Sequence, residues 1–142
     1  MPCQAHLGEV QAHRLEFERR AVSLVVVSFA EPAKLVYYQE QHQWPFPVLA
    51  DPHRAAYHAF TLKRLSLLRV FSPATLKLYW KLLRSGHHRE DYGKEDIYQA
   101  GGDFLVNREG QILFAHRSQD PTDRPSLRNL LDAVDRATKK TE

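Results

Sequence analysis

The chain contains very little sulfur, with one cysteine, Cys3, and one methionine among its 142 residues. A single cysteine excludes an intramolecular disulfide, so the sequence does not predict a secreted scaffold held together by cross-links. Long apolar runs are missing too, because the longest centres on residues 24–27 and a membrane span needs about 20 residues. Residues 1–9 lack the apolar run of a secretory signal, and we therefore expect a cytoplasmic protein.

An excess of charge of one sign is also absent, because 20 Lys and Arg residues offset 17 Asp and Glu residues and leave a net charge of +3. The basic residues are scattered apart from one modest group at Lys77, Lys81, Arg84 and Arg89. Nucleic-acid-binding proteins usually gather such residues on one face, so we expect no nucleic-acid partner. Hydrophobic residues form 43% of the chain, which is enough for a packed core, and the length predicts a single domain over residues 1–142.

Helical and extended patterns alternate along the chain. Periodic apolar residues and capping signals predict helices over residues 2–20, 31–42, 54–60, 72–86 and from about 125 onward. Apolar runs predict strands at residues 21–29, 47–51, 102–106 and 111–115, the last two joined by a hairpin turn. Residues 65–71 fit either a strand or a lid segment. This order predicts a layered α/β domain with a helical insertion at about residues 61–98.

The helix expected over residues 72–86 has several candidate roles. Its apolar residues share one face: Leu76, Tyr79, Trp80 and Leu83. The helix could be a lid over a reactive site, a dimer contact, or an insertion packed on the core. Such a face most often packs in a core, but we expect a lid or an interface here. The nearby Lys and Arg residues suit a membrane surface, but the segment is short for that role, so we expect no membrane partner.

Cys3 and His6 are the candidates for chemistry near the start of the chain. Cys3 lies in the first turn of a predicted helix, where the positive end of the helix dipole favours a thiolate by about 0.3 to 1 kcal/mol. His6 lies on the same helical face and adds to this effect when it is protonated. A lone cysteine can also be an inert, buried residue, and the residues alone leave both alternatives open. The eight histidines lack the spacing of a zinc site, so no metal and no other cofactor is expected.

Five stretches, taken in their order, carry a family resemblance. They are Cys3-Gln4-Ala5-His6-Leu7, Val25-Val26-Val27-Ser28-Phe29, residues 45–51, residues 99–106 and Arg124-Pro125-Ser126. Together they resemble the peroxiredoxin-like branch of the AhpC/TSA (alkyl hydroperoxide reductase and thiol-specific antioxidant) family. Members of this family usually carry a C-x-x-C motif at the helix start. The register places Cys3 at the second cysteine and the first just before Met1, so we expect this sequence to start late relative to its relatives.

The resemblance implies a thioredoxin-like fold, with a central mixed sheet flanked by helices. Compared with that fold, the predicted elements lack the usual strand before the first helix. The missing strand would lie between the strand at residues 21–29 and the hairpin. Backbone groups on both sides of an empty slot would be left unpaired, which is costly. We therefore expect a partner strand or upstream residues to fill the slot.

The resemblance also implies a function, that of a thiol–disulfide oxidoreductase acting on peroxides or disulfides. Cys3 would be the catalytic thiol, and His6, Gln99, Gly101 and Gly102 would bind substrate. The two glycines replace a cis-proline and allow close backbone approach, although a bulge or tight turn entering the strand explains them equally well. Because the chain has no second cysteine, an external thiol or a protein reductant is expected, and a homodimer is left open. The alternative is a redox-inactive module that binds a partner at Gly101 and Gly102.

Overall fold

Four short strands form two separate two-stranded sheets in the computed structural model, which describes residues 2–85, 96 and 98–140. In the first sheet, β1 (Val26–Ser28) pairs in parallel with β2 (Val48–Ala50). In the second, β3 (Gly102–Val106) pairs antiparallel with β4 (Ile112–Arg117). The described chain is therefore an α/β protein.

Helix α3 (Pro32–His42) connects the two parallel strands, as a crossover between parallel strands requires. Pro32 stands in the first turn, where its missing N–H costs nothing. The helix ends at Gln43, which takes a left-handed conformation with φ of 49° and donates its N–H to the carbonyl of Gln39. The expected helix over residues 31–42 and the strand over 47–51 are both confirmed.

The hairpin expected around residues 107–110 is also confirmed. Asn107 accepts a hydrogen bond from the Gln111 N–H through its side-chain oxygen, at 2.8 Å. Gly110 takes a φ of 81°, a conformation that favours glycine. These local contacts turn the chain from β3 into β4.

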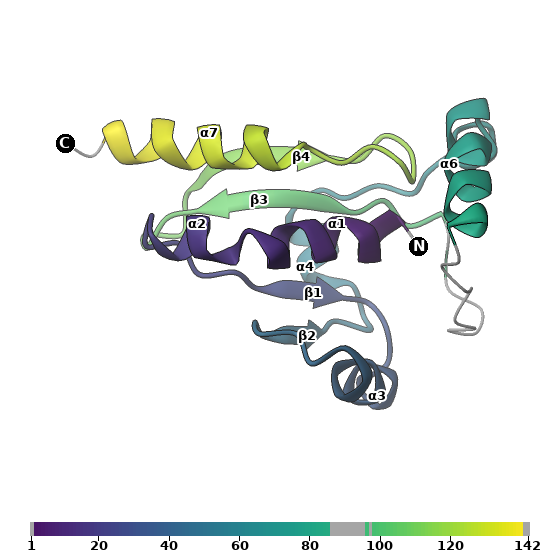
Figure 1. The fold of residues 1–142 in the computed structure, drawn as a ribbon, viewed down its shortest axis with the longest axis horizontal. Helices are drawn as coiled ribbons and strands as arrows, with labels where there is room; N and C mark the ends of the chain where they lie inside the picture. The colour runs from purple at the N-terminus through teal and green to yellow at the C-terminus, as the bar shows by residue number, and fades with distance from the viewer. Residues whose placement is uncertain (1, 86–95, 97, 141–142) are drawn as a thin grey trace.

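The remaining helices lie around the sheets, and two of them have side-chain caps. In Figure 1, α1 (Pro2–Ala12) and α2 (Arg14–Glu18) run across the front of the view between β3 and β1, while α7 (Leu127–Lys139) lies along β4. Ser126 caps α7 by accepting a hydrogen bond from the Asn129 N–H.

Between β2 and β3, the described residues form three further helices: α4 (Ala55–Ala59), α5 (Leu67–Val70) and α6 (Pro73–Arg84). Ser72 caps α6 through a hydrogen bond from the Thr75 N–H, as the Ser-Pro signal predicted. None of the helices in the described part of the chain is both long and apolar enough to cross a bilayer.

The structure corrects several local expectations. The helix expected over residues 2–20 is interrupted at His13, whose φ of −112° and ψ of 19° are not helical. The strand expected over residues 21–29 is shorter, because Ala21 takes a left-handed φ of 56° and pairing with β2 begins only at Val26. Residues 65–71 contain helix α5 instead of a strand, because the N–H of Val70 bonds the carbonyl of Ser66.

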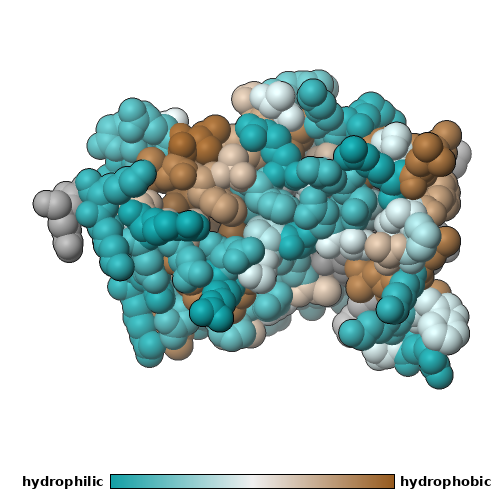
Figure 2. Space-filling view, turned by 90° about the horizontal axis from the view of Figure 1, so that it is seen from above, coloured by the Kyte–Doolittle hydropathy of each residue, from teal (hydrophilic) through white to brown (hydrophobic). Residues whose placement is uncertain are grey.

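The apolar face of α6 does not pack in the core, so the lid and interface roles expected for this helix stay predictions. Leu76, Trp80 and Leu83 are all exposed, and among the helix positions whose burial is described the buried one is the polar Thr75. Figure 2 shows apolar side chains gathered at the end of the molecule that carries α6 in Figure 1. The apolar face of α6 therefore lies on the outside of the molecule.

The expected single central sheet is not formed. No strand among residues 2–85, 96 and 98–140 pairs with the edge of β1 that faces away from β2, and β3 pairs only with β4. The Val27 carbonyl on that edge accepts a hydrogen bond from the Tyr57 hydroxyl at 3.2 Å. Since a sheet needs an unbroken series of backbone pairs, the two halves remain separate. The first described element is α1, so no described strand precedes the first helix.

Arg20 joins the end of α2 to α7. Its Nε donates to Asp135 Oδ1 at 2.8 Å, and its Nη1 donates to Glu16 Oε2 at 2.9 Å. These side-chain hydrogen bonds lower the pKa of Asp135 from 3.8 and the pKa of Glu16 from 4.5. The three side chains therefore make one ionic link between the two ends of the described chain.

This link predicts a loss of stability in acid. Glu16 and Asp135 each have a lower pKa in the folded state than in the unfolded state, so their ionisation stabilises the fold above about pH 4.5. This contribution is lost as the pH falls through their folded-state pKa values. We expect Arg20→Gln to flatten the slope of unfolding free energy between about pH 5 and pH 3, measured by urea unfolding. Arg19→Gln is the comparison variant: exposed Arg19 lies 3.1 Å from Glu16 and lowers only the pKa of Glu16, so its loss should flatten the slope less than the loss of Arg20, which lowers the pKa of both acids. An unchanged slope in Arg20→Gln would contradict the assignment.

Two glycines at the start of β3 permit close packing. A Cβ on Gly102 would lie 2.6 Å from the backbone carbonyl oxygen of His116 in β4. A Cβ on Gly101 would lie 2.7 Å from a guanidinium nitrogen of Arg124. Neighbouring protein groups therefore explain why both positions lack a side chain.

The two positions should differ in their tolerance of alanine. Gly102→Ala is expected to destabilise the fold by about 1 to 3 kcal/mol, because the strand backbone at His116 cannot move freely. Gly101→Ala should cost less, since it displaces only the end of a flexible arginine side chain. Denaturant unfolding of both variants tests this order, and equal destabilisation would refute it.

Candidate functional site

A partly buried hydrogen bond joins the first half of α1 to the start of β3. His6 Nε2 donates to Asp103 Oδ1 at 2.9 Å, across 97 residues of sequence. The two side chains are only 10% and 20% exposed. Because Asp103 directly follows Gly102, this contact places the His6 side chain beside the Gly101–Gly102 bend.

Arg124 completes this group from the segment before α7. Its Nη1 lies 3.7 Å from Asp103 Oδ2, and its side chain is 18% exposed. The same guanidinium lies over the Cα of Gly101, in space that a Cβ would occupy. Asp103 thus has a histidine at one oxygen and an arginine near the other. We call His6, Asp103 and Arg124 the His–Asp–Arg group.

Cys3 lies in the first turn of α1, three residues before His6. Residues three apart on a helix share a face and are separated by about 4.5 Å along the axis. The backbone of α1 therefore carries Cys3 toward the same side as the His–Asp–Arg group. The Cys3 side chain lies outside those that the structure describes, so its catalytic role stays a prediction.

The other expected site residues have mainly local contacts. The Gln99 amide donates to the carbonyl of Ala100 at 3.1 Å, and its backbone forms an isolated bridge with Arg64. Gly101 and Gly102 accommodate Arg124 and the His116 carbonyl. Their expected contacts with substrate are untested, while the packing alternative has a direct structural basis.

Sequence reasoning missed two members of the group. Asp103 and Arg124 both lie in stretches that carry the family resemblance, but the sequence assigned a role to neither. The available signal was the position of a carboxylate directly after two glycines at the start of a predicted strand. The partner histidine could not be identified without the tertiary contact, because it lies 97 residues away.

A second His–Asp pair lies nearby in sequence but is more exposed. His116 Nε2 is 2.9 Å from Asp123 Oδ1, and Asp123 Oδ2 also accepts the Gln119 N–H at 2.7 Å. This pair stabilises the turn after β4. Within the described residues, no group of three or more His, Cys, Asp or Glu side chains is arranged to hold a metal ion.

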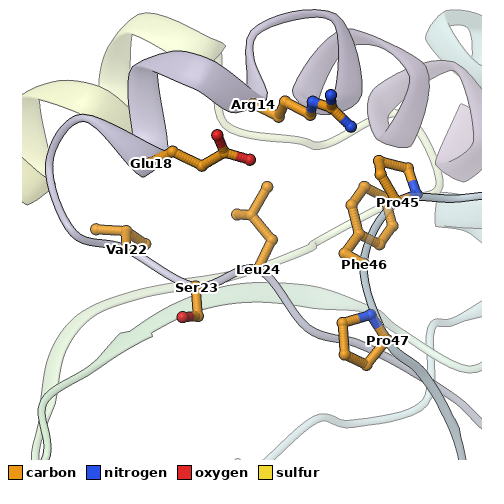
Figure 3. A pocket seen from close by; sticks show the side chains of 8 residues that line it. All are labelled: Arg14, Glu18, Val22, Ser23, Leu24, Pro45, Phe46 and Pro47. Carbon is orange, nitrogen blue, oxygen red and sulfur yellow. The ribbon is translucent and has the colours of Figure 1, made fainter.

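A cavity of about 240 Å³ lies beneath α2 (Figure 3). Arg14 and Glu18 approach it from the helix, and residues 22–24 and 45–47 form its other walls. These two segments directly precede β1 and β2, so the cavity lies at the amino ends of the parallel strands. It shares no residue with the His–Asp–Arg group and contains no nucleophilic thiol.

Comparison with known families places most of the chain within a family model. The family model described as AhpC/TSA antioxidant enzyme matches residues 11–120. The matched span includes Gln99, Gly101, Gly102 and Asp103, but it begins after Cys3 and His6. No curated protein matches the chain. Since the match covers most of the 142 residues, the chain belongs to the peroxiredoxin-like AhpC/TSA family of thioredoxin-fold redox proteins.

Proposed function

We propose that this chain is a peroxiredoxin-like thiol oxidoreductase that reduces peroxides or disulfides through Cys3. Membership of the AhpC/TSA family supports this class of activity. The observation that carries the proposal is the partly buried His6–Asp103 hydrogen bond, one helical turn from Cys3. In this proposal the two half-sheets belong to a thioredoxin-like fold. The single cysteine agrees with a reducing, cytoplasmic location.

The proposed reaction begins with a Cys3 thiolate, because the thiolate and not the thiol is the nucleophile. The sulfur attacks one peroxide oxygen, the O–O bond breaks, and the leaving oxygen takes a proton to become an alcohol or water. Cys3 becomes a sulfenic acid. An external thiol then displaces water to form a mixed disulfide, and a second thiol releases Cys3 as a disulfide forms between the two external thiols.

The His–Asp–Arg group supports the first step electrostatically. The Asp103 carboxylate accepts the hydrogen bond from His6 Nε2, which leaves Nδ1 available to hold a proton. A protonated His6 on the Cys3 face of α1 would stabilise the thiolate, as would the helix dipole. Arg124 orients Asp103 from the other side, 3.7 Å from its second oxygen. Asp103 and Arg124 are therefore positioning residues in this proposal.

Replacing the thiol gives the direct test of the proposed function. We expect Cys3→Ser to abolish peroxide-dependent consumption of an external thiol, because a serine hydroxyl cannot form a sulfenic acid. Peroxide turnover is measured with dithiothreitol as reductant, and mass spectrometry of a dimedone adduct detects the sulfenic acid on the wild-type protein. Wild-type turnover retained by Cys3→Ser, or no adduct on a folded wild type, would instead favour a redox-inactive binding module.

The role of Asp103 is tested separately by alkylation. We expect Asp103→Asn to slow alkylation of Cys3 by iodoacetamide about threefold to tenfold at neutral pH, and to move the pH midpoint of alkylation upward. The physical reason is that an amide no longer supports a positive charge on His6. Asp123→Asn makes the same change in the His116 pair and should leave the pH midpoint unchanged. Equal pH midpoints in both variants would reject the role of Asp103.

A further inference from the structure

The end of the molecule that carries α5 and α6 has a large exposed apolar surface. Leu68 is 87% exposed and Trp80 is 63% exposed. Four further apolar side chains of this region are exposed: Leu67, Phe71, Leu76 and Leu83. Monomeric soluble proteins rarely expose a contiguous apolar patch of this kind without an interaction to cover it.

The exposed face of α6 has two parallel stripes of different chemistry. The apolar stripe follows helical spacing through Leu76, Trp80 and Leu83. The basic stripe is displaced by one residue and consists of Lys77, Lys81 and Arg84. All six are exposed, so both stripes face outward together. The helix thus presents leucine and tryptophan side chains directly beside cations.

The two stripes are in contact with each other. The Arg84 guanidinium lies 4.6 Å from the centroid of the Trp80 ring, in a cation–π arrangement. A shallow hollow of about 480 Å³ is lined by Trp80, Ser85 and the three cations of the basic stripe. A cationic hollow bounded by an indole ring matches the anionic headgroup and the upper acyl region of a lipid.

The positive charge of residues 61–85 also favours an anionic lipid as the partner. Residues 61–85 contain six Lys and Arg residues and no Asp or Glu. One of them, Arg64, is held by Asp96, which it bonds at 3.1 Å. The segment therefore carries an excess of positive charge, although the net charge of the whole chain is only +3. Such a segment is attracted to anionic lipid headgroups.

We propose that α5 and α6 form a docking surface for anionic membranes, which Leu68, Trp80 and the neighbouring leucines enter while the basic stripe binds headgroups. Helices that lie in a membrane interface combine Trp or Leu on one side with Lys and Arg on the other. The absence of a membrane partner was expected because the segment is short. Exposure of the apolar stripe is the observation that changes this expectation. The proposal is independent of the chemistry of Cys3.

A second copy of the chain is a poorer occupant. A symmetric contact through this surface would bring two basic stripes together, because the same patch faces itself across a two-fold axis. Like charges placed opposite each other oppose association. A nucleic acid would complement the charge but leave the leucines exposed. An anionic bilayer would cover the apolar stripe with acyl chains and pair the basic stripe with its headgroups.

Vesicle co-sedimentation of the full chain tests the proposal. We expect binding to vesicles of equal parts phosphatidylcholine and phosphatidylglycerol, and at least about tenfold weaker binding to phosphatidylcholine alone. Lys77→Gln with Lys81→Gln should weaken anionic-vesicle binding about tenfold or more, and high salt should do the same. Lys139→Gln with Lys140→Gln removes the same charge at the end of α7 and is the matched control. Circular dichroism checks that every variant is folded.

Tryptophan fluorescence gives an independent readout. Trp44 is already buried, so insertion of Trp80 should produce a blue shift of the emission on adding anionic vesicles. Trp80→Phe should lose that shift. The proposal is overturned if the chain does not sediment with anionic vesicles, or if both double-lysine variants lose binding equally. It is also overturned if sedimentation equilibrium shows a dimer that Trp80→Ser returns to monomer, because the surface would then bind a second copy.

Discussion

The hydrogen bond between His6 and Asp103 is the contact on which the arrangement of the candidate site depends. It joins the first helix to the third strand across 97 residues, and it is largely shielded from water. A buried carboxylate or imidazole without a partner is costly, so each side chain constrains the position of the other. The start of α1 is consequently held against the Gly101–Gly102 bend. Burial of Val10 also holds α1 against the rest of the molecule, while the His6–Asp103 hydrogen bond joins its first turns to β3.

The glycines and Arg124 contribute to the same arrangement from the opposite side. Gly101 leaves room for the guanidinium, and the guanidinium in turn lies near the free oxygen of Asp103. Packing and electrostatics are therefore coupled at this position, since a larger residue at 101 would move the cation. The family match covers the bend and Asp103 but neither Cys3 nor Arg124. Family membership thus establishes the class of protein, whereas the positions of the individual groups come from the contacts.

Helices α6 and α7 show how one pattern leads to different outcomes. Both begin with a serine cap, both carry apolar residues at helical spacing, and both end with basic residues. The apolar stripe of α7 lies toward β4, with Ala133 and Val134 buried. The apolar stripe of α6 faces outward. Periodicity identifies which residues share a face, but the surface that this face meets depends on how the flanking segments dock.

Local chemistry in the sequence determined the caps at Ser72 and Ser126, the turn at Gly110, and most of the helices and strands. These features depend on neighbouring residues, so a short window contains the necessary information. Only the tertiary structure decided that His6 meets Asp103, that Arg124 covers Gly101, and that the sheet is present as two halves. The same holds for the outward direction of the α6 stripe. Each of these outcomes requires segments far apart in the chain to be brought together, and periodicity carries no information about that docking.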